Sequence, residues 1–160
     1  MKIIEYEDKY LEDVRELLVE LEEYLVLIDK DCLDQVHPEY KEKMAILDLK
    51  DVNSNNGKCY LAVEKDKAVG LIMGYIPSYD EFDYLDYKCP KRGKITELIV
   101  TNKTRNKGIG QLLINKIEEY FKSLGCEYIL VDVFAYNENA IKFYDKKGYH
   151  PRMYTNIKKI

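Results

Sequence analysis

The amino-acid sequence predicts an α/β fold in which a mixed sheet is covered by helices, within a single domain of residues 1–160. A chain of 160 residues suits one domain with its own core. Short apolar runs with strand character alternate with longer segments whose apolar residues recur at helical spacing. The sequence contains no internal repeat and no linker. These features predict one core built from both kinds of element.

In the first half of the chain, hydrophobic spacing separates helices from strands. An isoleucine-rich start predicts a strand, and the acidic segment after it carries a single apolar stripe at helical spacing. A second helix follows Pro38 and ends near the Asn-, Ser- and Gly-rich run at 53–57. Two apolar runs joined by the charged link 64–67 predict a hairpin of buried strands.

The second half predicts alternating strands and helices. A strand leads into an amphipathic helix that Gly125 closes, because glycine readily takes the left-handed conformation at a helix end. Another apolar run and a short helix closed by Gly148 follow, and the last residues predict a strand. The predicted elements are strand 2–6, helix 10–28, helix 39–53, strands 59–63 and 68–76, an irregular segment 77–92, strand 95–100, helix 109–124, strand 128–134, helix 139–147 and strand 153–160.

Composition excludes several classes of protein. Hydrophobic residues make up 46% of the chain, which argues against disorder. No apolar run approaches the roughly 18 residues of a membrane span, and the acidic N-terminal segment does not resemble a signal peptide, so we expect a cytoplasmic protein. The four cysteines form no Cys-x-x-Cys pair, which predicts reduced thiols and no metal site. A net charge of -4 argues against nucleic-acid binding.

Charge is divided unevenly along the chain. Residues 1–90 carry 22 acids and 11 bases, whereas residues 91–160 carry 7 acids and 14 bases. Such a division is typical either of a protein with two ligands of opposite sign or of two differently solvated faces.

A basic, glycine-containing segment between the strand at 95–100 and its following helix predicts an anion site. Two glycines let the backbone approach a ligand, and the first helical turn presents unpaired N–H groups. The spacing fits neither a Walker loop, because Gln111 follows the second glycine, nor a dinucleotide fingerprint, because Leu113 replaces the third small residue. The segment consists of Arg105, Asn106, Lys107, Gly108, Ile109 and Gly110.

A second motif follows the run YILVDVF. It has the form Asn-x-x-Ala-x-x-Phe-Tyr-x-x-x-Gly-Tyr over residues 137–149. Together with the Arg-x-x-Gly-x-Gly pattern of residues 105–110, it resembles the hallmarks of the GNAT superfamily of N-acetyltransferases, in the same order and each after a strand. The resemblance covers at least residues 94–150.

This resemblance implies a mostly antiparallel sheet whose fourth and fifth strands part at their ends and hold acetyl-CoA between them. The pantetheine would pair with the backbone of the segment Leu98, Ile99 and Val100. The pyrophosphate would lie on the amides of residues 105–110. Asn137 and Asn139 would contact the pantetheine or its phosphate side.

The resemblance also implies an acetyl transfer in which the amine attacks the thioester directly. Tyr144 matches the family's general acid, which protonates the departing thiolate. Glu97 is our candidate for the base that removes a proton from the ammonium, although its place on an alternating strand equally suits an ordinary surface glutamate. No Cys/His pair supports a covalent route.

The identity of the amine is left open by the sequence. An acidic and aromatic segment before the fourth strand, comprising Tyr79, Asp80, Glu81, Asp83 and Tyr84, would hold a cationic acceptor or simply form a solvated loop. Acetylation of protein amines and a non-enzymatic acetyl-CoA sensor or scaffold are the alternatives. Only a dozen residues follow Gly148, so the rim of the acceptor site is either open or completed by a second subunit, as in a homodimer.

Overall fold

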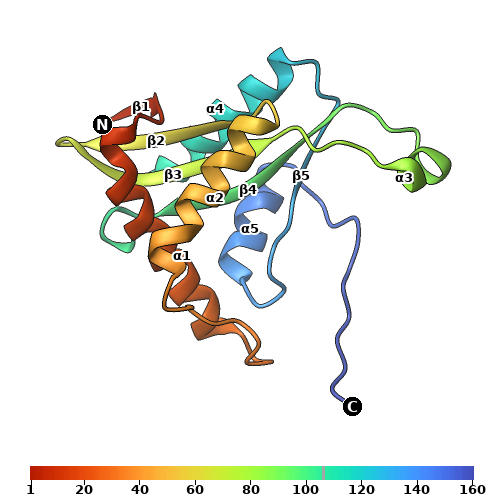
Figure 1. Ribbon diagram of the computed structural model, residues 1–160, viewed down its shortest axis with the longest axis horizontal. Coiled ribbons are helices and arrows are strands. Elements are labelled where there is room, and N and C mark those ends of the chain that lie inside the picture. Colours follow the sequence, from red (N-terminus) through yellow and green to blue (C-terminus); the bar gives the residue numbers. More distant parts are fainter. Residues whose placement is uncertain (106) are drawn as a thin grey trace.

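The computed structural model describes residues 1–105 and 107–160 and confirms the predicted α/β architecture (Figure 1). A five-stranded sheet has the order β1-β2-β3-β4-β5; it is antiparallel through β4, and β5 runs parallel to β4. The elements are β1 (Lys2–Glu5), the 3-10 turn η1 (Asp8–Tyr10), α1 (Leu11–Ile28), α2 (Tyr40–Ser54), β2 (Lys58–Glu64), β3 (Lys67–Tyr75), α3 (Glu81–Asp86), β4 (Arg92–Val100), the 3-10 turn η2 (Asn102–Thr104), α4 (Ile109–Ser123), β5 (Tyr128–Val131) and α5 (Glu138–Lys146).

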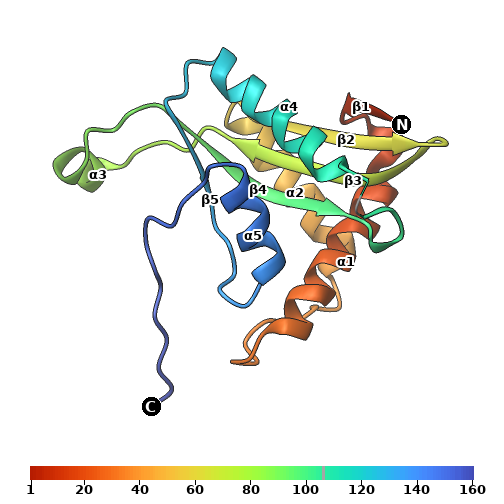
Figure 2. The same ribbon diagram turned by 180° about the vertical axis from the view of Figure 1, so that it is seen from behind.

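Helices cover both faces of the sheet (Figures 1 and 2). The helices α1 and α2 pack on one face, where Val14 and Leu18 meet Leu61 and Leu71 in the first core cluster. The helix α4 covers the other face and buries its apolar stripe completely, with Ile117 and other residues at 0% exposure. Each helix is therefore held by burial of one face, which is the main source of helix stability in proteins.

The edge of β4 that faces β5 is only partly paired. Register runs from Arg92 opposite Tyr128 to Ile95 opposite Val131, after which β4 continues to Val100 without β5 beside it. On its other edge β4 is paired with β3 from Lys94 to Val100, with an irregularity that leaves Thr96 as an extra residue between Ile95 and Glu97. Such a bulge bends the strand and re-aims its side chains. The predicted parting of the fourth and fifth strands is present.

Three predicted elements differ in the structure. Residues 153–160 were expected to form a strand but carry no regular secondary structure, because a strand needs a hydrogen-bonding partner and this segment lies against none. The irregular segment 77–92 contains the short helix α3, which begins with a reciprocal capping box between Asp80 and Asp83. The fifth strand ends at Val131 instead of residue 134, since beyond that point it has left β4.

Candidate functional site

A cleft of about 640 Å³ opens where β4 and β5 part. Ten of the twelve residues that the sequence predicted for cofactor binding line it, together with residues from α1 and α5. Lys107 belongs to the predicted set but not to the lining, and Asn106 lies outside the described residues. The lining residues are Leu21, Tyr24, Leu98, Ile99, Val100, Arg105, Gly108, Ile109, Gly110, Gln111, Asn137, Asn139, Ala140, Phe143 and Tyr144.

One end of the cleft is formed by the N-terminus of α4. Gly108 precedes the helix with a φ of 74°, a left-handed conformation that glycine adopts without strain. A Cβ atom on Gly110 would lie 3.6 Å from the Phe143 ring, an ordinary van der Waals distance, so α4 and α5 pack closely at this point. The first N–H groups of α4 have no partner within the helix and carry the positive end of its dipole. They therefore present donors for an anion.

Arg105 is held at the same end of the cleft. Its Nε donates to the Val100 carbonyl oxygen (3.0 Å), and its guanidinium lies 3.9 Å from Glu20 and 5.8 Å from the centre of the Tyr24 ring. These contacts tie a positive charge to the end of β4 while leaving the side chain exposed. Lys107 is exposed nearby in the sequence and adds a second positive charge to this segment.

The residues before and within α5 form the opposite wall. The Asn137 side-chain oxygen accepts from the Ala140 amide (3.1 Å) and caps α5, which fixes the side chain with its NH₂ group available to a ligand. One residue earlier in the same loop, the Tyr136 hydroxyl donates to Asp31 (3.0 Å), which joins this loop to the connection between α1 and α2. The α1–α2 and β5–α5 connections lie side by side in the lower part of Figure 1.

Tyr144 lines the cleft, and Glu97 lies behind the lining, near enough for its charge to act on Tyr144. Tyr144 is 7% exposed and packs its ring edge-on against Phe143 and Tyr149, at 5.3 and 5.4 Å between ring centres. Burial and the Glu97 carboxylate raise the pKa of Tyr144. Tyr144 comes from α5 and Glu97 from β4. This is the pair predicted from the sequence as acid and base.

Two further acids lie around Glu97, and sequence reasoning missed both. Burial, then Asp48 on α2 and Glu22 on α1, raise the pKa of Glu97 to about 8. Burial and Asp51 raise the pKa of Asp48 to about 6, and one oxygen of Asp48 is buried without a hydrogen-bond partner among the described residues. We call Glu22, Asp48 and Glu97 the acid cluster.

Tyr40 completes the surroundings of the acid cluster. Burial and the three carboxylates raise the pKa of Tyr40. The described residues pair no base with any of the three acids. The sequence contained a signal, because Glu22 and Asp48 continue the buried helical stripes that run through Leu18 and Ala45.

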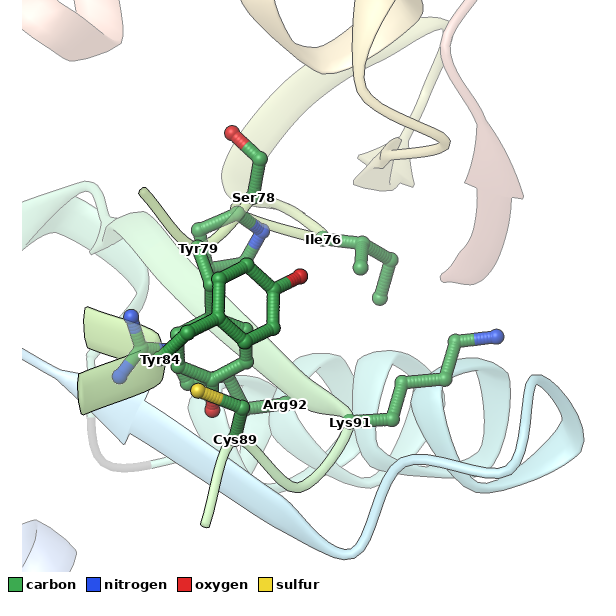
Figure 3. A pocket seen from close by; sticks show the side chains of 8 residues that line it. Ile76, Ser78, Tyr79, Tyr84, Cys89, Lys91 and Arg92 are labelled. Atoms are coloured by element: carbon green, nitrogen blue, oxygen red, sulfur yellow. The ribbon is translucent and has the colours of Figure 1, made fainter. Parts of the chain in front are cut away.

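The acidic segment predicted to hold the acceptor is not in the lining of this cleft. Tyr79 and Tyr84 instead line a second cavity of about 290 Å³ at the start of β4, where the Arg92 guanidinium stacks 4.0 Å from the centre of the Tyr79 ring (Figure 3). Asp80 and Asp83 are engaged in the capping box of α3. The structure thus does not bring these residues together with Tyr144 and Glu97.

A sequence profile of the acetyltransferase (GNAT) family matches residues 12–149. The chain belongs to this family. The matched region contains the glycine-containing segment 105–110, which we call the cradle, together with the acid cluster and Tyr144. No helix among the described residues has the length and apolar character to cross a bilayer. Within the same residues, no group of three or more His, Cys, Asp or Glu side chains is placed to hold a metal ion.

Curated GNAT-like relatives match parts of the chain. An uncharacterized N-acetyltransferase of Methanocaldococcus jannaschii is 32% identical over 95 residues, which are 59% of this chain and 54% of that protein. N-alpha-acetyltransferase MAK3 of Arabidopsis thaliana is 28% identical over 91 residues, 57% of this chain and 44% of that protein. The chain therefore spans about half or less of the length of these relatives.

Solved structures share the whole GNAT fold. A tetramutant of the BH1408 protein from Bacillus halodurans superposes with a TM-score of 0.82 at 20% identity, over 100% of both chains. An aminoglycoside N-acetyltransferase in complex with CoA superposes with a TM-score of 0.69 at 15% identity, over 99% of this chain and 100% of that one. At this level of identity the likeness establishes the fold.

The raised pKa of Glu97 predicts a pH-dependent stability. Between its ordinary pKa near 4.5 and about 8, the folded protein holds a proton on Glu97 that the unfolded chain has lost, so stability falls as pH rises through this range. Glu97→Gln removes this loss. We therefore expect the free energy of unfolding of Glu97→Gln, minus that of wild type, to increase by about 3 to 5 kcal/mol between pH 5 and pH 9.

Urea unfolding of both proteins from pH 5 to pH 9 measures this difference. Glu23→Gln, a change at an exposed position of the same helix as Glu22, is the matched control and leaves the profile unchanged. A constant difference between Glu97→Gln and wild type across this range would show that Glu97 is not protonated in the folded protein near neutral pH.

Proposed function

We propose that this protein transfers the acetyl group of acetyl-CoA to a primary amine of a cationic acceptor, by direct attack in a ternary complex. The observation that carries the proposal is that the buried Tyr144 lines the cleft with Glu97 close enough to raise its pKa, while burial, Asp48 and Glu22 raise the pKa of Glu97. A phenol and a carboxyl placed near each other beside a cleft suit a reaction that moves two protons. We expect a cytoplasmic protein, as predicted from the sequence.

The cleft fits acetyl-CoA as a substrate. The pyrophosphate would lie at the N-terminus of α4, where free amides meet the positive charges of Arg105 and Lys107. The pantetheine would add to the free edge of β4 at Leu98 and Val100 like a further strand. An aminoglycoside N-acetyltransferase with this fold binds CoA, which supports the same use of the cleft here.

Glu97 and Tyr144 together would account for the two proton transfers that the reaction needs. Glu97 takes one proton from the acceptor ammonium, and the freed nitrogen attacks the acetyl carbonyl carbon, so that a C–N bond forms and the C–S bond breaks. Tyr144 donates its proton to the departing CoA thiolate, and the second proton lost by the nitrogen restores the phenol. Because a bound ammonium lowers the pKa of a neighbouring carboxyl, the acceptor itself favours the ionised form of Glu97.

The acid cluster indicates a second positive charge on the acceptor. Glu22, Asp48 and Glu97 come from three elements, and none of them is paired with a base in the described part of the chain. Like charges held together without a cation are unfavourable, and an incoming cation relieves this repulsion. We therefore propose a diamine- or polyamine-like small molecule, with one amine beside Tyr144 and a second charge near Asp48.

A protein amine is the second candidate acceptor. Two relatives, from Arabidopsis thaliana and Xenopus laevis, are named N-alpha-acetyltransferases. A basic peptide would satisfy the same acid cluster, so the two acceptor classes are separated by experiment. A non-enzymatic acetyl-CoA sensor would use the same cleft but would need neither an acid nor a base beside it.

Binding of CoA is the first test. CoA held only by the folded state raises its stability by about 2.7 kcal/mol at 100 times its dissociation constant, which is a shift of several degrees in melting temperature. Arg105→Glu with Lys107→Glu is expected to abolish this shift. Lys50→Glu with Lys122→Glu makes the same charge change at exposed positions outside the cleft lining and preserves it. A wild-type protein whose melting is unaffected by millimolar CoA would contradict the proposal.

Replacement of the proposed acid tests the chemical step. Tyr144→Phe keeps the packed ring and removes the donor, so turnover is expected to fall by about 10²–10⁴-fold while the CoA-induced melting shift stays the same. Tyr149→Phe is the matched control, because that hydroxyl donates to Glu118 (2.9 Å) on the far side of the ring pair. Thiol release from acetyl-CoA measures both variants. Equal turnover in Tyr144→Phe and wild type would leave this tyrosine with a packing role alone.

The acceptor class is tested with paired amines. Glu22→Gln with Asp48→Asn is expected to raise the KM for diamines at least about 10-fold while changing the KM for a monoamine of equal length far less. Glu23→Gln with Glu119→Gln removes the same charge at exposed positions and serves as the control. Activity on peptides with a free N-terminus but not on diamines would favour the second candidate. An equal change for both amines would exclude a second cation at the acid cluster.

A further inference from the structure

The segment between β3 and β4 forms an arm, residues 77–91, that projects from the body of the protein (Figures 1 and 2). Its helix α3 buries none of its residues. Phe82 is 77% exposed, Leu85 83% and Tyr84 66%. Clustered exposure of large apolar side chains marks an interaction surface more often than single exposed residues do.

The last segment, residues 150–160, forms a tail that starts beside the arm. The Arg152 guanidinium lies 5.6 Å from the centre of the Tyr87 ring, which places the beginning of the tail against the end of α3. Beyond this point the tail runs away from the arm (Figure 1). Met153 is 82% exposed and Tyr154 79%. We define the arm–tail patch as Phe82, Tyr84, Leu85, Tyr87, Met153, Tyr154 and Ile157.

The size of the arm–tail patch matches what a stable association needs. Seven large side chains exposed by roughly half to four fifths present on the order of 800 Å², which is about the area that each partner buries in a standard protein interface. The cavity beneath Tyr79 and Tyr84 opens at the base of the arm and offers room for an apolar or aromatic anchor (Figure 3).

The two parts of the patch carry opposite charge. The arm holds four acids, Asp80, Glu81, Asp83 and Asp86, against the two bases Lys88 and Lys91, whereas the tail holds Arg152, Lys158 and Lys159 and no acid. A surface that is acidic at one end and basic at the other is complementary to itself after a two-fold rotation. Tyr128, 61% exposed, continues the surface, because it begins β5 opposite Arg92, where the arm rejoins the sheet.

We propose that two copies of this chain associate through the arm–tail patch about a two-fold axis, with the tail of each copy lying on the arm of the other. The acidic arm of one copy attracts the basic tail of its partner, and the exposed rings and aliphatic side chains of both are buried together. The interface depends on neither CoA nor an acceptor, so its failure and the failure of the acetyltransferase proposal are distinguishable.

Sedimentation equilibrium of the full chain tests the association. The wild type is expected to sediment at twice its mass of 18.9 kDa. Phe82→Ser with Leu85→Ser, and separately Met153→Ser with Tyr154→Ser, are expected to raise the dimer dissociation constant at least about 100-fold. Leu27→Ser with Leu47→Ser, 80% and 55% exposed on α1 and α2, is the matched control and leaves the mass unchanged. Thermal melting confirms that all variants fold.

Charge reversal tests the proposed geometry. Glu81→Lys with Asp86→Lys, or Lys158→Glu with Lys159→Glu, places like charges on both surfaces and is expected to weaken the dimer. All four changes together restore the complementarity and the dimer. A wild type that is monomeric up to about 0.5 mM would overturn the proposal. A dimeric mass that is unchanged in the arm variant or in the tail variant would also overturn it. The same holds if the combined charge reversal does not restore the dimer.

Discussion

The structure depends on the unequal pairing of the two edges of β4. One edge is paired with β3 from Lys94 to Val100, whereas the other is paired with β5 only from Arg92 to Ile95. Backbone groups of a strand need hydrogen-bonding partners, so the unpaired stretch to Val100 is an open position in the sheet. The cleft, the N-terminus of α4 and the start of α5 are all arranged around this stretch.

Burial of carboxyl groups under α1 and α2 lowers the stability of the folded protein. Glu97 projects between the sheet and two helices that each add a carboxylate, so that its ionised form is destabilised by low solvation and by repulsion. Apolar packing of α1 and α2 on β2 and β3 holds the acids in place despite this cost. A site arranged in this way is less stable without a cation than with one, which is the state expected of a binding site.

How far the sequence predicts the site depends on the distance along the chain between its residues. The cradle at residues 105–110 and the start of α5 at Asn137 are local motifs, and nearly all their described residues line the cleft as predicted. The acid cluster was missed, because Glu22 and Asp48 reach Glu97 only through the packing of α1 and α2 on the sheet. The acidic segment at 79–84 was assigned to the acceptor by its place in the sequence, whereas the arm carries it to another cavity.

The sequence by itself determined the identity, order and approximate limits of most helices and strands, and the two motifs at the CoA end of the cleft. These follow from hydrophobic periodicity, helix ends and glycine positions, which act over a few neighbouring residues. Only the tertiary structure decided that β5 leaves β4 at Val131, that residues 153–160 form no strand, and that Glu22 and Asp48 lie near Glu97. Strand pairing and burial of charge are contacts between segments far apart in the chain, and no local pattern specifies which partner each segment finds.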